Sequence, residues 1–275
     1  MTDTNAKIPE AVRGALQSSG FPFQTAVAHV IRAAPGWKVY ASEYPWQGPG
    51  GDDQFLDLVA TNGKLFLAIE CKKTRKDILT FLRPLGHSHT GKVDRFRCLR
   101  AEQIRDATRR VEIFCEDWAL YPTSTCAEFC VVSTSESGKD QRLLERDAGL
   151  VIRATDAFAQ VFRERFPPGS NLSPPCLLLP VIVTNASIYT ARYEPSEVSL
   201  ETGEFSELPR EIEGAPCVRF RKAFTSEGRR DLGDRSVFVV NAAQLSEFLG
   251  LVDPAPDQLQ PPERARVHFQ MQSRR

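Results

Sequence analysis

The spacing of apolar residues predicts that helices open this chain and strands follow. Apolar positions recur at helical spacing over residues 8–18 and again over 22–34, which predicts two short helices before the turn-forming pair Pro35-Gly36. Residues 37–44 then predict a first strand, and the Gly- and Pro-rich segment 45–53 predicts a loop. The expected order is therefore helix, helix, strand, loop.

Two further apolar strands are separated by a tight turn. Residues 54–60 and 65–69 are both rich in apolar side chains, and Asn62-Gly63 lies between them. Asn-Gly between two apolar runs is the strongest short signal for a β-hairpin. We expect these two strands to pair antiparallel.

Charged residues interrupt both strands of this hairpin. Asp57 stands in the middle of the first strand, and the second strand runs into Glu70, Cys71 and Lys72. Because successive strand side chains point to opposite faces, Glu70 and Lys72 project together and Cys71 points away. Pairing the strands brings Asp57 near Glu70. Two acids and a lysine at one strand end could hold a divalent cation and polarise a water. The alternative is a purely structural ion pair, whose charges discourage association at an exposed strand edge.

The rest of the chain predicts more strands and three further helices. Together these elements predict one α/β domain over residues 1–252, with a core at 8–166 and a strand extension at 170–252. Residues 253–275 are Pro-rich and polar, which predicts a disordered tail. The expected helices are at 101–113, 141–166 and 243–249, and Asn241 is expected to cap the last of them. The expected strands are at 126–134, 176–183, 188–193, 218–224 and 236–240. We expect 188–193 to pair with 176–183, and 218–224 to be half exposed.

Composition points to a protein without membrane spans. The chain has 275 residues, of which 41% are hydrophobic and 25% charged. It holds no apolar run of about 20 residues and no signal-peptide layout, so we expect a cytoplasmic location and no membrane partner. Seven cysteines are scattered, several in apolar runs, which predicts reduced buried thiols. A zinc site is not expected, because the spacings of His87, His89, Cys98, Cys115, Cys126 and Cys130 follow no tight paired pattern.

The charge distribution is uneven although the net charge is zero. Residues 61–112 hold 13 Lys and Arg against 6 Asp and Glu, a net charge of +7, whereas residues 113–213 hold 8 against 16, a net charge of −8. Basic charge around the Glu70 strand suits a polyanion such as DNA, although solvated helix faces would give the same count. The acidic half cannot be a DNA face, and we expect it to be a homodimer or partner-protein surface. Glu145 and Asp147 in this half are expected on a helix surface.

Residues 20–73 resemble the core of the PD-(D/E)XK nuclease superfamily, the restriction-endonuclease-like fold, and in particular its Mrr-type branch. The pattern of that branch is a glycine, an aromatic and a Glu or Gln opening a helix, then a strand, a loop, an acid inside a strand, and acid-x-Lys on the next strand. The matching residues here are Gly20, Phe21 or Phe23, Gln24, Asp57, and Glu70 with Lys72. The resemblance implies a mixed central sheet flanked by helices, with the later strands added to it.

The resemblance also implies a reaction and roles. It implies that Asp57 and Glu70 bind Mg²⁺ (or Mn²⁺) together with the backbone carbonyl of Cys71, and that Lys72 orients the attacking water for phosphodiester hydrolysis. Gln24 stands where many Mrr-type members have Glu, and an amide binds a metal weakly, so Glu43 is the candidate for a third ligand.

The resemblance therefore implies a nuclease acting on DNA, in a setting of bacterial defence or restriction. The candidates for contact with the phosphate backbone are basic residues near the strand end and in the following segment: Lys73, Arg75, Lys76, Arg105 and Arg109. The alternative is a catalytically inactive module of the same fold that binds nucleic acid or a protein.

Overall fold

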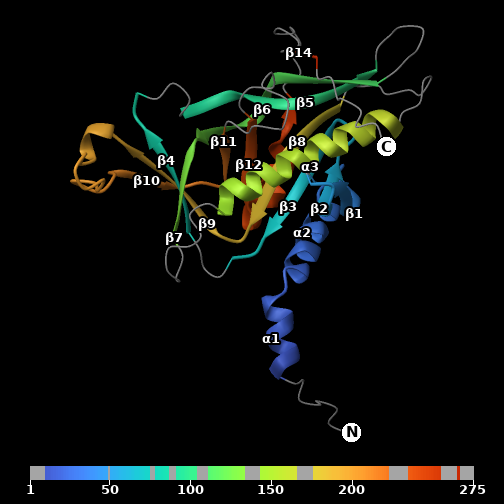
Figure 1. Ribbon diagram of the computed structural model, residues 1–275, viewed down its shortest axis with the longest axis horizontal. Coiled ribbons are helices and arrows are strands. Elements are labelled where there is room, and N and C mark those ends of the chain that lie inside the picture. The colour runs from blue at the N-terminus through green and yellow to red at the C-terminus, as the bar shows by residue number, and fades with distance from the viewer. Residues whose placement is uncertain are drawn as a thin grey trace.

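The computed structural model describes residues 10–48, 50–74, 78–86, 91–103, 111–133, 143–165, 176–222, 235–254 and 265–266 (Figure 1). The α-helices are α1 (Glu10–Ser18), α2 (Phe21–Ala33), α3 (Leu143–Arg165) and α4 (Leu245–Leu251), and short 3-10 helices are η1 (Pro195–Glu197) and η3 (Ala242–Gln244). The strands are β1 (Lys38–Gln47), β2 (Asp53–Thr61), β3 (Leu65–Lys72), β4 (Ile78–Pro84), β5 (Gly91–Gln103), β6 (Val111–Ala127), β7 (Phe129–Ser133), β8 (Cys176–Thr184), β9 (Ser187–Tyr193), β10 (Glu211–Gly214), β11 (Cys217–Lys222), β12 (Arg235–Asn241), β13 (Asp253–Pro254) and β14 (Ala265–Arg266).

Ten of the described strands form a mixed central sheet in the order β1-β2-β3-β8-β12-β11-β6-β13, with β5 and β14 also paired to β6. The first three strands are an antiparallel meander, and β3, β8 and β12 run parallel. The expected α/β class with a mixed sheet is confirmed. The C-terminal strands are not peripheral, however, because β8 and β12 lie in the middle of this sheet.

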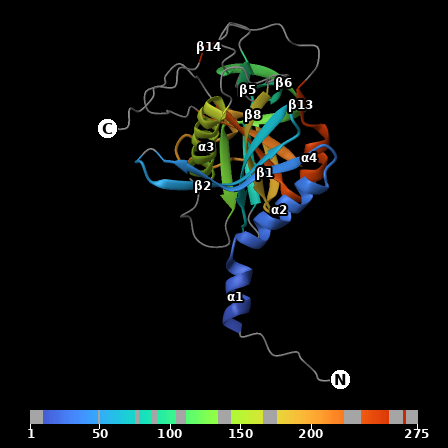
Figure 2. The ribbon, with the colours of Figure 1, turned by 90° about the vertical axis from the view of Figure 1, so that its right-hand side faces the viewer.

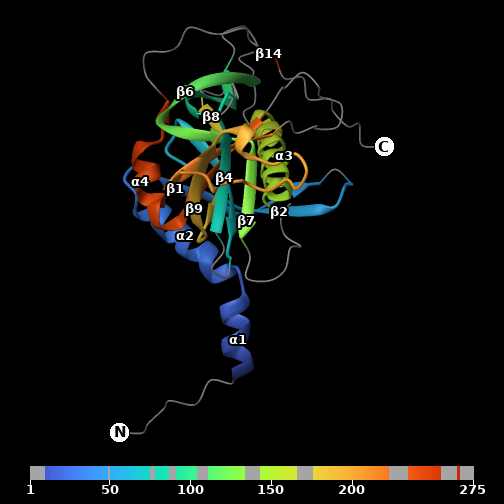
Figure 3. The same ribbon diagram turned by 90° about the vertical axis from the view of Figure 1, so that its left-hand side faces the viewer.

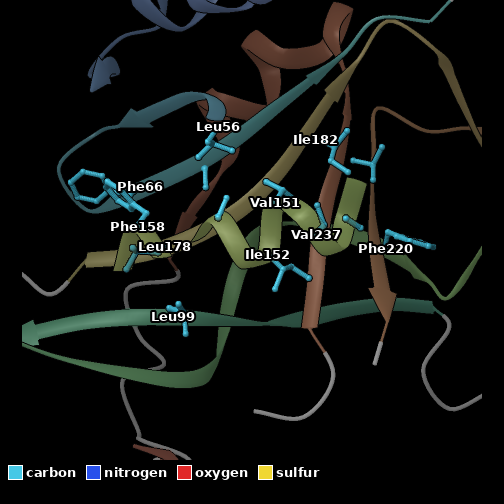
Figure 4. Packing of buried hydrophobic residues seen from close by; sticks show 14 of the residues in the cluster. Leu56, Phe66, Leu99, Val151, Ile152, Phe158, Leu178, Ile182, Phe220 and Val237 are labelled. Carbon is cyan, nitrogen blue, oxygen red and sulfur yellow. The ribbon is translucent and has the colours of Figure 1, made fainter. Parts of the chain in front are cut away.

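Helices cover both faces of the central sheet. In Figures 2 and 3, α3 lies on one face, and α2 and α4 lie together on the other. Each face has its own apolar core, and Figure 4 shows the α3 side, where Val151 and Phe158 pack toward the strands. The ring of Phe158 lies 5.7 Å from that of Phe66 on β3, which ties the middle of α3 to the start of the strand that ends in Lys72. Burial of a large apolar side chain of this kind contributes about 1.5–3 kcal/mol.

A second sheet, with the order β10-β9-β4-β7, lies beside the first. Residues 188–193 were expected to pair with the preceding strand, and this was wrong, because β9 instead pairs with β4 and β10. The turn at Asn185 and Ala186 carries the chain out of the central sheet and into the second one. The expected strand at 126–134 is likewise divided, with β6 in one sheet and β7 in the other.

The prediction of a helix over residues 101–113 was wrong. Residues 101–103 end β5 and residues 111–113 begin β6, and the two strands pair antiparallel from Gln103 with Val111 onward. Alternating polar and apolar positions fit a half-buried strand as well as a short helix, and the pairing of two long strands decided the outcome. Residues 104–110, including Arg105 and Arg109, lie outside the described residues.

Residues 218–222 form part of β11 as predicted, but the expectation of a half-exposed strand is wrong at Arg219. Arg219 is only 1% exposed. Its guanidinium lies 5.7 Å from the ring centroid of Phe96 and 5.8 Å from that of Phe238, and these two rings stack at 4.4 Å. Cation–π contact allows the charge to be buried where the alternating pattern predicted a solvent-facing side chain.

Several local predictions are confirmed. Asn62 accepts backbone N–H groups of Lys64 and Leu65, and Gly63 adopts a φ of 91°, so the hairpin turns where Asn-Gly predicted it. The helices predicted at 8–18, 22–34, 141–166 and 243–249 correspond to α1, α2, α3 and α4. Asn241 caps η3, which leads into α4, by accepting the N–H of Ala243. All seven cysteines are free thiols, and all except Cys71 are buried.

Among the helices in the described part of the chain, none is long and apolar enough to cross a membrane. Of the segment 253–275, only β13 and β14 belong to the described residues, so the predicted disorder of the rest is outside them.

Candidate active site

Three acidic residues stand on three neighbouring strands at one level of the central sheet. The register of β1 with β2 places Glu43 across from Asp57, and the register of β2 with β3 places Glu70 on the other side of Asp57. The predicted proximity of Asp57 and Glu70 is therefore present, and it arises from the Asn-Gly hairpin. Lys72 follows two residues after Glu70 and shares its side of the strand.

Asp57 is tied to the end of the next strand. Its Oδ2 accepts the backbone N–H of Cys71 at 2.6 Å. Burial raises the pKa of the Asp57 carboxyl, the hydrogen bond from Cys71 opposes that rise, and the charge of Glu43 adds to it. The Cys71 thiol has a raised pKa because of burial and the neighbouring carboxylates of Asp57 and Glu70, so it stays protonated near neutral pH. A protonated thiol is a poor metal ligand, so the backbone carbonyl of Cys71, rather than its sulfur, is the candidate ligand.

Glu70 is the most constrained of the three acids. It is 7% exposed, its Oε1 lies 2.9 Å from Lys72 Nζ, and its Oε2 is buried with no hydrogen-bond partner. Burial first, and then the charge of Asp57, raise the pKa of Glu70 to about 7, although Lys72 opposes the shift. A buried carboxylate oxygen without a donor is costly, and a cation would satisfy it.

Asp147 on α3 also belongs to this site, and the expectation that it lies on a helix surface was wrong. It is buried, and its Oδ1 lies 3.4 Å from Lys72 Nζ. Burial would lower the pKa of Lys72, but Glu70 and Asp147 together raise it, so the lysine remains charged. Helical spacing offered a signal, because Asp147 follows Leu144 by three residues and precedes Val151 by four, and both are buried.

Gln24 approaches the acids from α2 on the other face of the sheet. Its Nε2 donates to the Oε1 of Glu43 and, at 2.9 Å, to the backbone carbonyl of Asp57. Glu43 adopts a φ of 50°, the one positive φ among the described residues other than glycine. A left-handed backbone at a non-glycine residue costs free energy, and here the irregular backbone carries an acid of the cluster. Gln24 and Glu43, both predicted from the sequence, are thus brought to Asp57.

The chain beyond Lys72 is held by two sets of contacts. Lys73 donates from Nζ to the carbonyls of Gln17 and Ser19, at 3.0 Å for Ser19, so it contacts the end of α1. Thr74 donates its N–H to Asn185 Oδ1 at 2.6 Å, and Asn185 Nδ2 donates to the carbonyl of Thr74 at 3.0 Å. The next predicted phosphate contacts, Arg75 and Lys76, lie outside the described residues.

The donor set suits a hard cation. Among the described residues, no group of three or more His, Cys, Asp or Glu side chains has the geometry of a preformed metal site. Mg²⁺, however, uses one or two carboxylates and keeps several waters. Asp57, Glu70 with its unpartnered Oε2, and the Cys71 carbonyl match that requirement, and Glu43 is adjacent.

Comparison with protein-family models, with curated proteins and with solved structures found no significant match for this chain.

Proposed function

We propose that this chain is a Mg²⁺- or Mn²⁺-dependent nuclease of the PD-(D/E)XK type that acts on DNA. The observation that carries the proposal is the cluster of Asp57, Glu70 and Lys72 at one end of the central sheet, in which a buried oxygen of Glu70 has no hydrogen-bond partner. Burying two acids side by side raises their pKa values and costs stability. A site for a divalent cation gives a physical reason to keep them.

The arrangement of the elements supports the same proposal. The resemblance implies a mixed sheet flanked by helices, with Gln24 at a helix start, Asp57 inside a strand, and Glu70 and Lys72 on the next strand. Each of these residues lies on the expected kind of element, and Gln24 reaches the backbone of Asp57. The setting of bacterial defence rests on the resemblance alone.

Each residue of the proposed site would have a separate role in cleavage. Asp57 and Glu70 would hold the cation, with the Cys71 carbonyl beside them and Glu43 as a further carboxylate. When bound, the cation would neutralise phosphate charge and lower the pKa of a water molecule. Lys72, which remains charged, would stabilise the negative charge that develops on the phosphate oxygens. Gln24 orients Glu43 and fixes the backbone of Asp57.

Plasmid cleavage tests this proposal. Purified protein should nick or linearise plasmid DNA in the presence of Mg²⁺ or Mn²⁺ and not in the presence of a chelator. Asp57→Ala and Lys72→Ala should abolish cleavage. Matched controls are Asp53→Ala, an exposed acid on the same strand as Asp57, and Lys64→Ala, an exposed lysine just before β3, and both should cut like wild type. Equal cleavage by wild type and the two site variants would refute the proposal.

A binding module without turnover is the second candidate. It is favoured by one observation, because the ammonium of Lys72 is already engaged by two carboxylates, those of Glu70 and Asp147. Calorimetry with Mn²⁺ separates the candidates. Metal binding that is lost in Asp57→Ala and Glu70→Ala supports the nuclease, whereas DNA binding without any metal binding supports the module.

The acidic segment 194–213 is the proposed surface for a partner protein or a second copy. It holds seven glutamates and one arginine, and most of these side chains are exposed. A truncation that removes residues 170–275 could not test this surface alone, because it would also remove β11 and β12 from the central sheet. Replacing Glu201, Glu204 and Glu207 by lysine tests the surface without removing these strands. The readouts are the mass of the protein in solution and plasmid cleavage.

A further inference from the structure

Lys72 is held between carboxylates that come from two different elements. Its Nζ lies 2.9 Å from Glu70 Oε1 on β3 and 3.4 Å from Asp147 Oδ1 on α3. The side chain of Asp147 is 13% exposed, and the other cation near it, Arg146, lies 3.9 Å away with a side chain that is 71% exposed. Asp147 is thus directed mainly at Lys72.

The proposed function makes conflicting demands on Glu70. It must hold a cation, and it also holds the ammonium of Lys72. Two positive charges within a few ångströms repel each other, and partial burial weakens the screening of that repulsion. A cation at Glu70 therefore loosens the contact between Glu70 and Lys72. A lysine that acts on the phosphate then needs a second anchor.

We infer that Asp147 is a positioning residue that retains Lys72 at the site while Glu70 holds the cation. This inference rests on the proposed nuclease function and adds to it a residue from α3. Asp147 would act through Lys72 rather than through direct contact with the cation or the phosphate. Because α3 packs its apolar face on the central sheet, it fixes the position of Asp147 beside Lys72 at the end of β3.

The test compares variants in Mn²⁺ calorimetry and in single-turnover DNA cleavage. In Asp147→Asn, Lys72 has only Glu70 as a partner and competes harder with the metal, so the Kd for Mn²⁺ should rise about tenfold. The single-turnover cleavage rate at saturating protein should fall about tenfold to a hundredfold, with the half-saturating protein concentration within twofold of wild type. Asp147→Glu keeps the charge and should recover most of both losses.

A matched control is available on the same helix. The side chain of Asp156 is 14% exposed and pairs with one buried cation, Arg235, at 3.1 Å. Asp156→Asn removes an ion pair that is more deeply buried than the pair of Asp147 with Lys72, so its loss of stability is an upper bound for the cost of losing such a pair to the fold. It should lower stability and leave Mn²⁺ binding and the cleavage rate per folded molecule unchanged.

A double-mutant cycle decides whether Asp147 acts through Lys72. In a Lys72→Met background, Asp147→Asn should change Mn²⁺ affinity by less than about twofold. Wild-type affinity in Asp147→Asn, or an undiminished loss in the Lys72→Met background, would overturn the inference and leave the proposed function standing. If the wild-type protein neither binds Mn²⁺ nor cuts DNA, the proposed function fails, and the inference falls with it.

Discussion

Asp57 Oδ2 and the backbone nitrogen of Cys71 are 2.6 Å apart, so a side chain of β2 fixes the end of β3 between Glu70 and Lys72. The acid proposed to hold a cation therefore also has a structural task. Glu70 and Lys72 flank the hydrogen-bonded N–H on either side. Changes at Asp57 should thus separate into an effect on folding and an effect on metal binding.

Asp57→Asn should lose metal binding and keep the fold. The amide oxygen can still accept the N–H of Cys71, so the free energy of unfolding should stay within about 1 kcal/mol of wild type, whereas Asp57→Ala leaves that N–H unpaired and should cost about 1–3 kcal/mol. Urea unfolding and Mn²⁺ calorimetry measure the two effects. Equal destabilisation by both variants would contradict the structural role of this hydrogen bond.

Gln24→Glu should destabilise the metal-free protein. The amide of Gln24 donates to a carboxylate and to a carbonyl, and a second carboxylate could donate to neither while repelling Glu43. We expect a loss of about 1–3 kcal/mol near pH 8, in part restored by Mg²⁺. Gln24→Met, which removes the donor without adding charge, is the control and should show no Mg²⁺-dependent recovery. Thermal unfolding with and without Mg²⁺ measures this, and a variant as stable as wild type would contradict it.

Glu70 should make the stability of the metal-free protein fall as pH rises. Its folded-state pKa is about 7, against an ordinary value of 4.5, so between these two values the folded state binds more protons than the unfolded state. The favourable contribution is complete below about pH 4.5 and is lost as pH rises through about 7. At about 1.4 kcal/mol per pKa unit, the loss reaches at most about 3 kcal/mol.

Comparison with Glu70→Gln isolates this effect from other titrating groups. The variant carries no ionisable group at this position, so its unfolding free energy should gain on that of wild type between pH 5 and pH 8. Urea unfolding at several pH values with a chelator present measures the difference. Parallel pH curves for the two proteins would show that Glu70 ionises normally. Mg²⁺ at pH 8 should stabilise wild type and have little effect on the variant.

Asn185→Ala should loosen the segment after Lys72, although Asn185 lies 111 residues from Thr74 in the chain. Asn185 accepts from the Thr74 backbone and donates back to it, which holds the segment after Lys72 against the end of β8. The Thr74 hydroxyl also donates to Asn185 Oδ1, at 3.2 Å. Losing all three bonds should cost about 1–3 kcal/mol and reduce cleavage, while Asn185→Asp keeps the acceptor and should lose less. Hydrogen exchange at Thr74 reports the local opening directly. Unchanged protection there in Asn185→Ala would contradict this role.

Local signals in the sequence predicted the elements around the site correctly. Apolar spacing gave α2 and α3, the Asn62-Gly63 pair gave the β2–β3 hairpin, and strand alternation placed Glu70 and Lys72 on one side. These features depend on neighbours within a few residues, and backbone sterics and the two-residue period act at that range. The α/β class and the positions of Asp57 and Glu70 could therefore be predicted.

Long-range contacts were not predictable in the same way. Whether residues 101–103 and 111–113 belong to a helix or to two strands depends on the pairing of β5 with β6. Whether Arg219 is buried depends on Phe96 and Phe238. Asp147 and Asn185 lie far along the chain, and the folded structure brings them into contact with Lys72 and Thr74 at the end of β3. Their spacing carried at most a weak signal, because a polar residue on a helix or in a turn is common.

The sequence by itself determined the hairpin, the placement of Glu70 and Lys72 on the same side of the strand, and the acid on the neighbouring strand. Tertiary structure alone decided that α3 brings Asp147 to Lys72, that α2 brings Gln24 to Glu43, and that β8 lies parallel to β3 at the centre of the sheet. The physical reason is that strand alternation is a property of each backbone segment. The meeting of distant side chains depends on how apolar faces pack together, and every residue in the core contributes to that packing.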